Sequence, residues 1–185
     1  MPEPLPPAEL ARGPRGPSAA ELVAIGRVRP VLVDPDPMLR RRCEPVGQLD
    51  WPRLCRLAGD LLASMYAVGG RGLAAPQIGE PWRAFVMDAG WKEGAPRPRL
   101  ILDPTLVALS GPRVTAVETC LSLPGRPVPV TRAENVVIEH FDLLGQALTL
   151  FLSGIEARIA QHEDDHLDGR LIVDLLAQDG ALIAR

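Results

Sequence analysis

Hydrophobic positions return along this chain at two periods, one typical of a helix and one typical of strands. Leu54, Leu57, Leu61 and Met65 follow one another at spacings of three or four residues, which places them on one face of a helix. This pattern predicts an amphipathic helix over about 51–67. The glycines at positions 69, 70 and 72 then end it.

Most of the remaining chain consists of short runs rich in Val, Leu and Ile, bounded by Pro, Gly and Asp. Such runs predict strands, which we assign to 83–87, 100–102, 106–109, 113–117, 128–130, 136–141 and 147–152. The segment 142–145 is a hairpin connection between the last two. Short strands in succession around one strongly marked helix indicate an α+β fold, with antiparallel β-sheets packed around a central metal-binding helix, the one that carries residues 162–166.

The N-terminal segment is rich in proline, with six prolines before position 18. A proline-rich stretch cannot continue a helix and buries little surface, so we expect 1–26 to form a mobile arm. The remaining 27–185 has the length of one ordinary domain, and 46% hydrophobic content is enough to build a core. We therefore predict a single domain over 27–185.

Charge and cysteine content indicate in which cellular compartment the protein works and which classes of partner it binds. The net charge of −3 gives no reason to expect sequence-specific nucleic acid binding, and no apolar run approaches the length of a membrane span. The first residues lack the apolar core of a secretory signal, and three cysteines cannot all pair within one chain, so we expect a cytoplasmic protein. Cys43 and Cys55 are then inert thiols. The basic run 40–42 is expected to be the solvated end of an element, with a transient ribosome contact as the less favoured alternative.

An H-E-x-x-H motif near the C-terminus carries the strongest chemical signal. On a helix, residues four apart lie on one face, so His162 and His166 can bind one metal ion while Glu163 points to the same edge. A capping box of Ser153 and Glu156 predicts where this helix begins, and the glycine at position 169 where it stops. The motif is therefore the outline of a hydrolytic metal site.

A third metal ligand has to come from elsewhere in the chain. After His166 the only acids are aspartates, and Ile172 stands where a metzincin would place a histidine. His140 lies in a strand-like run, whereas Cys120 lies in a short extended segment that ends in a turn signal. The thiolate of Cys120 would complete a Cys-His-His set with a fourth position open, as in catalytic rather than structural sites.

Three separated segments together resemble the signature motifs of the peptide deformylases, which remove the N-formyl group from nascent polypeptides. Residues 70–77 read G-R-G-L-A-A-P-Q, residues 118–122 read E-T-C-L-S, and residues 161–169 read Q-H-E-D-D-H-L-D-G. Their order and spacing match the family, and the similarity runs from about residue 29 to about residue 176. The resemblance makes 27–185 a catalytic metallohydrolase domain acting on N-formylated peptides, with formate as a product.

The resemblance also implies a metal and its ligands. It assigns one divalent transition metal to Cys120, His162 and His166. One soft sulfur beside two imidazoles suits Fe(II), Zn(II), Ni(II) or Co(II), and the sequence does not choose among them. The resemblance favours Fe(II).

Catalytic and substrate-binding roles follow from the same resemblance. Glu163 is the expected general base, and the oxyanion is stabilised by the side-chain amide of Gln77 and the backbone N–H of Leu121. Residues 69–72, here called the glycine loop, are expected to border the substrate, because residues without a Cβ allow close approach of the backbone. The substrate-binding residues implied are Gly70, Arg71, Gly72 and Leu73.

Two positions depart from the family pattern and leave other functions open. Thr119 stands where glycine is usual, and we expect it to be extended; Arg71 stands where an apolar residue is usual, and we expect it to project into the cleft mouth or to pair with an acid. The alternatives are a specialised paralogue that deformylates another formamide and a catalytically weak protein whose metal is a structural staple. A third is a thiol hydrolase with Cys120 as nucleophile.

Overall fold

The computed structural model describes residues 16–176, and residues 1–15 and 177–185 lie outside this range. The helices are α1 (Ala19–Ile25), α2 (Trp51–Ala67), α3 (Gly154–Leu167) and α4 (Ile172–Leu176). The strands are β1 (Gly72–Ala74), β2 (Ala84–Met87), β3 (Arg99–Glu118), β4 (Val128–Phe141) and β5 (Ala147–Ser153). This mixture confirms the predicted α+β class. Within the described residues, no helix is both long enough and apolar enough to cross a membrane.

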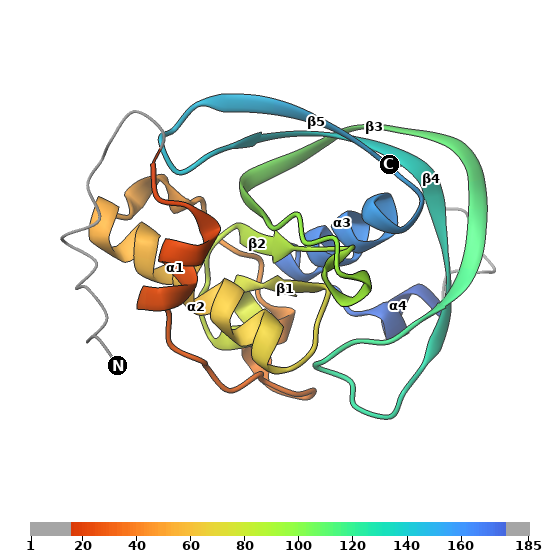
Figure 1. Cartoon of the computed structure of the whole chain (residues 1–185). Coiled ribbons are helices and arrows are strands. Elements are labelled where there is room, and N and C mark those ends of the chain that lie inside the picture. Colours follow the sequence, from red (N-terminus) through yellow and green to blue (C-terminus); the bar gives the residue numbers. More distant parts are fainter. Residues whose placement is uncertain (1–15, 177–185) are drawn as a thin grey trace.

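The strands form one antiparallel sheet in the order β1-β2-β3-β4-β5. Figure 1 shows β3, β4 and β5 arching over α3, which lies inside the curve. The arrangement agrees with the prediction of antiparallel strands packed around the helix that carries the H-E-x-x-H motif. It also leaves β1 at one edge of the sheet, directly before the turn η4 (Ala75–Ile78).

β3 is one continuous strand, so the predicted division into strands at 100–102, 106–109 and 113–117 is wrong. The pairing of β3 with β4 shifts register between Leu102 and Thr105 and between Ser110 and Arg113. These irregularities lie at the prolines at positions 104 and 112, which cannot donate a ladder hydrogen bond. The bulges absorb the prolines without ending the strand. The predicted strands 128–130 and 136–141 likewise belong to one strand, β4.

β1 and β2 lie between two helices, and their alternating side chains explain how. On β2, Ala84 and Val86 belong to the core cluster with α2, whereas Phe85 and Met87 belong to the cluster with α3. A strand buried on both faces reads as a continuous apolar run, as this one does. The predicted helix 51–67 is confirmed as α2, and the helix that carries the motif is buried on nearly every side.

The expectation of a mobile arm over 1–26 is wrong for its last part, since α1 lies within it. Ser18 caps this helix in a capping box with Glu21, and Leu22 and Ile25 are buried against α2. The two helices approach closely because Gly59 has no side chain: a Cβ there would lie 2.5 Å from the carbonyl oxygen of Leu22. The rest of the predicted arm, 1–15, falls outside the described residues.

The ends of α3 differ in part from the prediction. Ser153 is the N-cap residue, but its side chain makes no capping hydrogen bond, so the predicted capping box with Glu156 is wrong. Glu156 instead lies 3.5 Å from the guanidinium of Arg99. The helix ends at Leu167 before Gly169, whose φ is 71° and whose missing Cβ leaves room for the backbone of residue 40.

The remaining expectations from the sequence concern surface and buried groups. Cys43 and Cys55 are buried, and burial raises the pKa of the Cys43 thiol to about 11, in agreement with an inert thiol. The basic run 40–42 begins at the last residue of η2 (Pro37–Arg40), so it is an element end as predicted. Arg40 there pairs with Asp174 on α4.

Candidate metal centre and active site

The structure brings the predicted ligands together from two distant segments. α3 carries His162 and His166 on one face, and Cys120 follows the end of β3. The sulfur and one ring nitrogen of each histidine lie within 4.8 Å of one another, and the Cys120 Sγ is 3.3 Å from the Nε2 of His166. His140 is not part of the group: it lies in β4 with its Nδ1 3.1 Å from the carbonyl oxygen of Phe141. In residues 16–176 this is the one set of histidine, cysteine and acidic side chains with such spacing.

The chemistry of this set suits a transition metal. The Nδ1 of His162 is 2.9 Å from a carboxylate oxygen of Glu118, which leaves its Nε2 for a metal, as is common for metal-bound histidine. The Nδ1 of His166 and the Oε2 of Glu163 are buried without a hydrogen-bond partner in the described part of the chain. A thiolate, two imidazoles and a buried carboxylate without a partner fit a three-ligand site with one position open.

The protonation of the two histidines follows from the same neighbours. Burial lowers the pKa of His162, but hydrogen bonds with Cys120 and Glu118 outweigh burial and raise it to about 10. Burial and the nearby charge of His162 hold the pKa of His166 well below its usual range. Binding of a cation therefore competes with a proton at His162, and His166 is already neutral.

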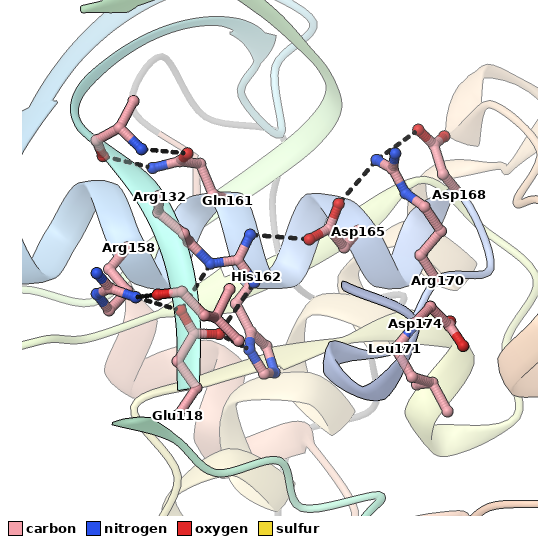
Figure 2. Close-up of polar contacts among 12 residues, drawn as sticks. Glu118, Arg132, Arg158, Gln161, His162, Asp165, Asp168, Arg170, Leu171 and Asp174 are labelled. Atoms are coloured by element: carbon pink, nitrogen blue, oxygen red, sulfur yellow. Dashed lines mark hydrogen bonds and ion pairs between the residues drawn. The ribbon is translucent and has the colours of Figure 1, made fainter. Parts of the chain in front are cut away.

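Glu118 orients His162 and is itself held by two arginines (Figure 2). Arg132 from β4 contacts both carboxylate oxygens, at 2.7 and 2.9 Å, and Arg158 from α3 lies 2.7 Å from the first of them. Burial raises the pKa of Glu118, but the hydrogen bonds from His162 and Arg132 outweigh it and lower the pKa to about 2. Glu118 is therefore ionised and fixed beside the ligand.

The same network continues along α3. The third guanidinium nitrogen of Arg132, Nη1, lies 2.8 Å from Asp165, which in turn lies 2.7 Å from Arg170 (Figure 2). Arg132 is buried, so its charge has to be compensated by these acids. This support could not be predicted from the sequence. Glu118 stands in the segment quoted for its resemblance, but its partners lie on two other elements, Arg132 on β4 and both Arg158 and His162 on α3, and only folding shows that they meet.

Glu163 lies beside the glycine loop. A Cβ on Gly72 would lie 2.2 Å from the Oε1 of Glu163, so only glycine fits at that position. The carboxyl group is buried, and burial raises its pKa to about 7. The positive charge of a metal ion bound to the neighbouring histidines acts in the opposite direction.

Gln77 from η4 and Leu121 complete the inner wall. The Oε1 of Gln77 accepts a hydrogen bond of 2.9 Å from the backbone N–H of Ala74, which fixes the side chain. Its Nε2 lies 3.1 Å from the Oγ of Ser122 and 3.8 Å from the Cys120 Sγ. Within the described residues, the backbone N–H of Leu121 makes no hydrogen bond. The side-chain amide of Gln77 and the backbone N–H of Leu121 thus both lie near the candidate metal position.

These residues line a cleft with a volume of about 470 Å³. Gly70, Arg71 and Gly72 line it, as predicted for substrate-binding residues. The side chain of Leu73 does not: β1 alternates, and this residue is fully buried in the core cluster with α2. The substrate-binding role predicted for Leu73 stays a prediction, and it would rest on the backbone of this residue.

The two departures from the motif pattern are also explained by their surroundings. Arg71 lines the cleft and pairs with Glu93, and it donates a hydrogen bond of 2.6 Å to the carbonyl oxygen of Ala89. The expected pairing with an acid is confirmed. Thr119 does not have a positive φ, since Asp103 is the only such non-glycine residue among those described. A β-branched side chain is therefore tolerated there, as expected.

Comparison with protein families points to one family over most of the chain. The model of the family described as "Polypeptide deformylase" matches residues 28–181. The chain is 40% identical over 152 residues to a peptide deformylase of Brucella suis, an alignment that covers 82% of this chain and 86% of the relative. It is 42% identical over 153 residues to peptide deformylase 2 of Streptomyces coelicolor, covering 83% and 85%.

Comparison with solved structures gives the same result. The class I type b peptide deformylase of Acinetobacter baumannii, in a crystal structure with Met-Ala-Ser bound, aligns with a TM-score of 0.75 at 31% identity. The alignment covers 80% of this chain and 98% of that one. The peptide deformylase of Thermotoga maritima aligns with a TM-score of 0.75 at 34% identity, covering 80% and 97%.

Proposed function

Since this chain belongs to the polypeptide deformylase family, which removes the N-formyl group from nascent peptides, we propose the residues that perform this reaction here. The observation that carries the proposal is the group of Cys120, His162 and His166 within 4.8 Å, with the buried carboxylate of Glu163 alongside. The substrate is the N-terminal formylmethionine of a newly made polypeptide, and the products are formate and a free amino terminus.

Cys120, His162 and His166 hold one divalent metal ion, which the family requires. When bound, such an ion supplies a Lewis acid and lowers the pKa of water in its open coordination position. We favour Fe(II), because a single thiolate beside two imidazoles suits it and the family resemblance points to it.

Glu163 is the general base and then the general acid. It accepts a proton from the water that attacks the formyl carbon and returns that proton to the leaving amine. Its buried position in the cleft beside Cys120 and His162 supports both transfers, because a general acid–base has to lie within reach of the reacting group. Gly72 keeps the space in front of the carboxylate free.

Gln77 and the backbone N–H of Leu121 stabilise the negative charge that develops on the formyl oxygen. Preorganised donors of this kind typically contribute about 3–4 kcal/mol each to the transition state. The hydrogen bond that the Ala74 N–H donates to the Oε1 of Gln77 supports this role in oxyanion stabilisation, because it directs the amide nitrogen toward the Cys120 side of the cleft.

The peptide lies extended along the glycine loop. Residues 70–72 line the cleft and lead into β1, which is an edge strand and so has backbone groups available for pairing. A formyl group is small, so the inner end of the cleft can exclude larger acyl groups sterically.

The test is turnover of formyl-Met-Ala-Ser by protein purified without oxygen, together with elemental analysis of the same sample. Metal with release of formate supports the proposal. Turnover without metal would support a thiol hydrolase, and metal without turnover would support a structural site or another formamide substrate. Either of these results would overturn the assignment.

A further inference from the structure

Lys92 occupies a particular place at the mouth of the cleft. It is the only lysine in the sequence, and it lines the same cleft as the glycine loop and Glu163. It belongs to η5 (Trp91–Glu93), and its ammonium group lies 5.6 Å from the centre of the Trp91 ring. Because its side chain is exposed, the charge is available to a molecule that enters the cleft.

The backbone that carries Lys92 is fixed against the glycine loop. The indole N–H of Trp91 donates a hydrogen bond of 2.7 Å to the carbonyl oxygen of Gly70. The Trp91 ring packs edge-on against Tyr66, with ring centres 5.3 Å apart. Glu93, on the other side of Lys92, pairs with Arg71. Contacts on both sides of Lys92 therefore hold it at this edge of the cleft.

The arginine side chains that line the cleft are already paired with acids. Arg71 is neutralised by Glu93, and Arg158 and Glu118 neutralise each other deeper in the wall. Within residues 16–176, Lys92 forms no ion pair with an acid. Its ammonium is therefore the charge at the cleft mouth that a substrate can compensate.

The glycine loop sets the distance between Lys92 and the reacting group. Gly72 abuts the carboxylate of Glu163, whereas a Cβ on Gly69 would lie 4.0 Å from the Nζ of Lys92. Gly69 and Gly72 are three positions apart in the chain, a span of at most about 10 Å in an extended conformation. A substrate lying extended alongside, with its formyl group at Glu163, brings its third residue to the level of Lys92.

We propose that Lys92 is a specificity residue that favours formyl peptides with an acidic side chain at the third position. The inference rests on the proposed function, because the substrate is placed by its formyl group at Glu163. The recognition is an ion pair at a partly exposed site, so the preference should be roughly two- to fivefold over a neutral peptide. It should also weaken as salt concentration rises.

The experiment compares kcat/KM for three C-terminally amidated peptides, formyl-Met-Ala-Glu, formyl-Met-Ala-Ser and formyl-Met-Ala-Lys. Amidation removes the terminal carboxylate, which would otherwise compete for the same ammonium. In the native protein we expect kcat/KM to be highest for the Glu peptide, intermediate for the Ser peptide and lowest for the Lys peptide. The three values should be equal in Lys92→Met, and the native order should be retained in Lys92→Arg. Lys92→Glu should reverse it.

Two further variants test the place of the charge. Arg53→Met removes one exposed positive charge from the far end of α2 and should keep the native order. Arg71→Ile leaves Glu93 without its partner beside Lys92, so it should reduce the preference for the acidic peptide with metal content unchanged. Equal effects of Arg71→Ile on acidic and neutral peptides would exclude Arg71 from selectivity.

The outcomes separate this inference from the proposed function. Turnover of the serine peptide with no preference for glutamate, or a preference that survives in Lys92→Met, overturns the role of Lys92 alone. If no formyl peptide is turned over, the proposed function fails. Calorimetric binding of Met-Ala-Glu amide and Met-Ala-Lys amide to native protein and Lys92→Met then decides the role of Lys92: equal affinities in the native protein overturn it.

Discussion

The candidate ligands are held in place in different ways, but each supplies one of only three protein atoms to the metal site. His162 is held by the ionised carboxylate of Glu118, His166 follows it by one turn of α3, and Cys120 lies near the amide of Gln77. Three protein ligands are the minimum for a catalytic site of this kind. A variant that lacks one ligand should therefore lose the metal ion, whereas a variant that lacks Glu163 should keep the ion and lose catalytic activity.

At the residue scale, we predict that Cys120→Ala, His162→Ala and His166→Ala each lose stable metal binding. Elemental analysis of the purified variants measures this directly. Cys43→Ala is the matched control, since it removes a buried free thiol outside the site and should keep about one metal ion per chain. Full metal content in Cys120→Ala would contradict the ligand assignment.

A second prediction separates the base from the ligands. Glu163→Gln keeps the size of the side chain in its buried position and should keep the metal. It should lower kcat by at least the ~10²–10⁴-fold typical of lost general acid–base catalysis. Kinetics with formyl-Met-Ala-Ser and elemental analysis on one sample provide both values. A variant that loses its metal would show that Glu163 is a ligand instead.

At the level of helices and strands, close packing at glycine positions sets the distance between neighbouring elements. Gly59 on α2 admits the backbone of α1, and Gly72 on β1 admits the carboxylate of Glu163 on α3. Between them, β1 and β2 are covered on both faces. Small residues at these crossings therefore set the spacing between elements that carry the site.

Gly59→Ala tests the crossing of α1 and α2. Alanine favours a helix over glycine by about 1 kcal/mol, but its Cβ would lie 2.5 Å from the Leu22 carbonyl oxygen, so backbone has to move. We expect the steric clash to outweigh the gain in helix propensity, so the free energy of unfolding measured in urea titrations should fall by about 1–3 kcal/mol. Gly47→Ala, whose Cβ would meet nothing within 4 Å, should change it by less than about 1 kcal/mol. Equal stability of the two variants would contradict the packing of α1.

At the scale of the whole molecule, the cleft forms where three parts of the chain meet. α3 supplies the base and two ligands, the end of β3 supplies the thiolate, and the glycine loop before β1 forms the opposite wall. The long β3–β4 ribbon joins these parts, because Arg132 on β4 compensates acids on both β3 and α3. Stability of the sheet is therefore a property on which the site depends.

The pH dependence of sheet stability can be predicted from His140, which lies on β4 away from the metal centre. Burial lowers its pKa, opposed by the Phe141 carbonyl and Asp142 and assisted by Arg99. A lowered pKa means that the unfolded chain binds the proton more readily, so this stability is present above 6.5 and is lost as pH falls below it. Urea unfolding at about pH 8 and about pH 5.5 should show a larger loss in the native protein than in His140→Asn. Equal losses would show that His140 does not titrate differently on folding.

Much of the fold could be predicted where local pattern and tertiary packing agree. The helix at 51–67 follows its period because one face packs on β1 and β2. α1 was missed because its signal, Ser18 and Glu21 before Leu22 and Ile25, follows a run of prolines that suggests no structure. β3 was divided because prolines interrupt its pattern, and only pairing with β4 shows that bulges accommodate them.

The chemistry could be predicted from residue types and helical spacing, which restrict Cys120, His162, Glu163 and His166 to few uses. The groups that support and border that chemistry are known only from the folded chain. Glu118, Arg132 and Asp165 meet across three elements, Leu73 turns into the core, and Lys92 comes to the cleft mouth through the contacts of its neighbours. The reason is physical: helical spacing is fixed by bond geometry, whereas contacts between distant segments depend on how the whole chain packs.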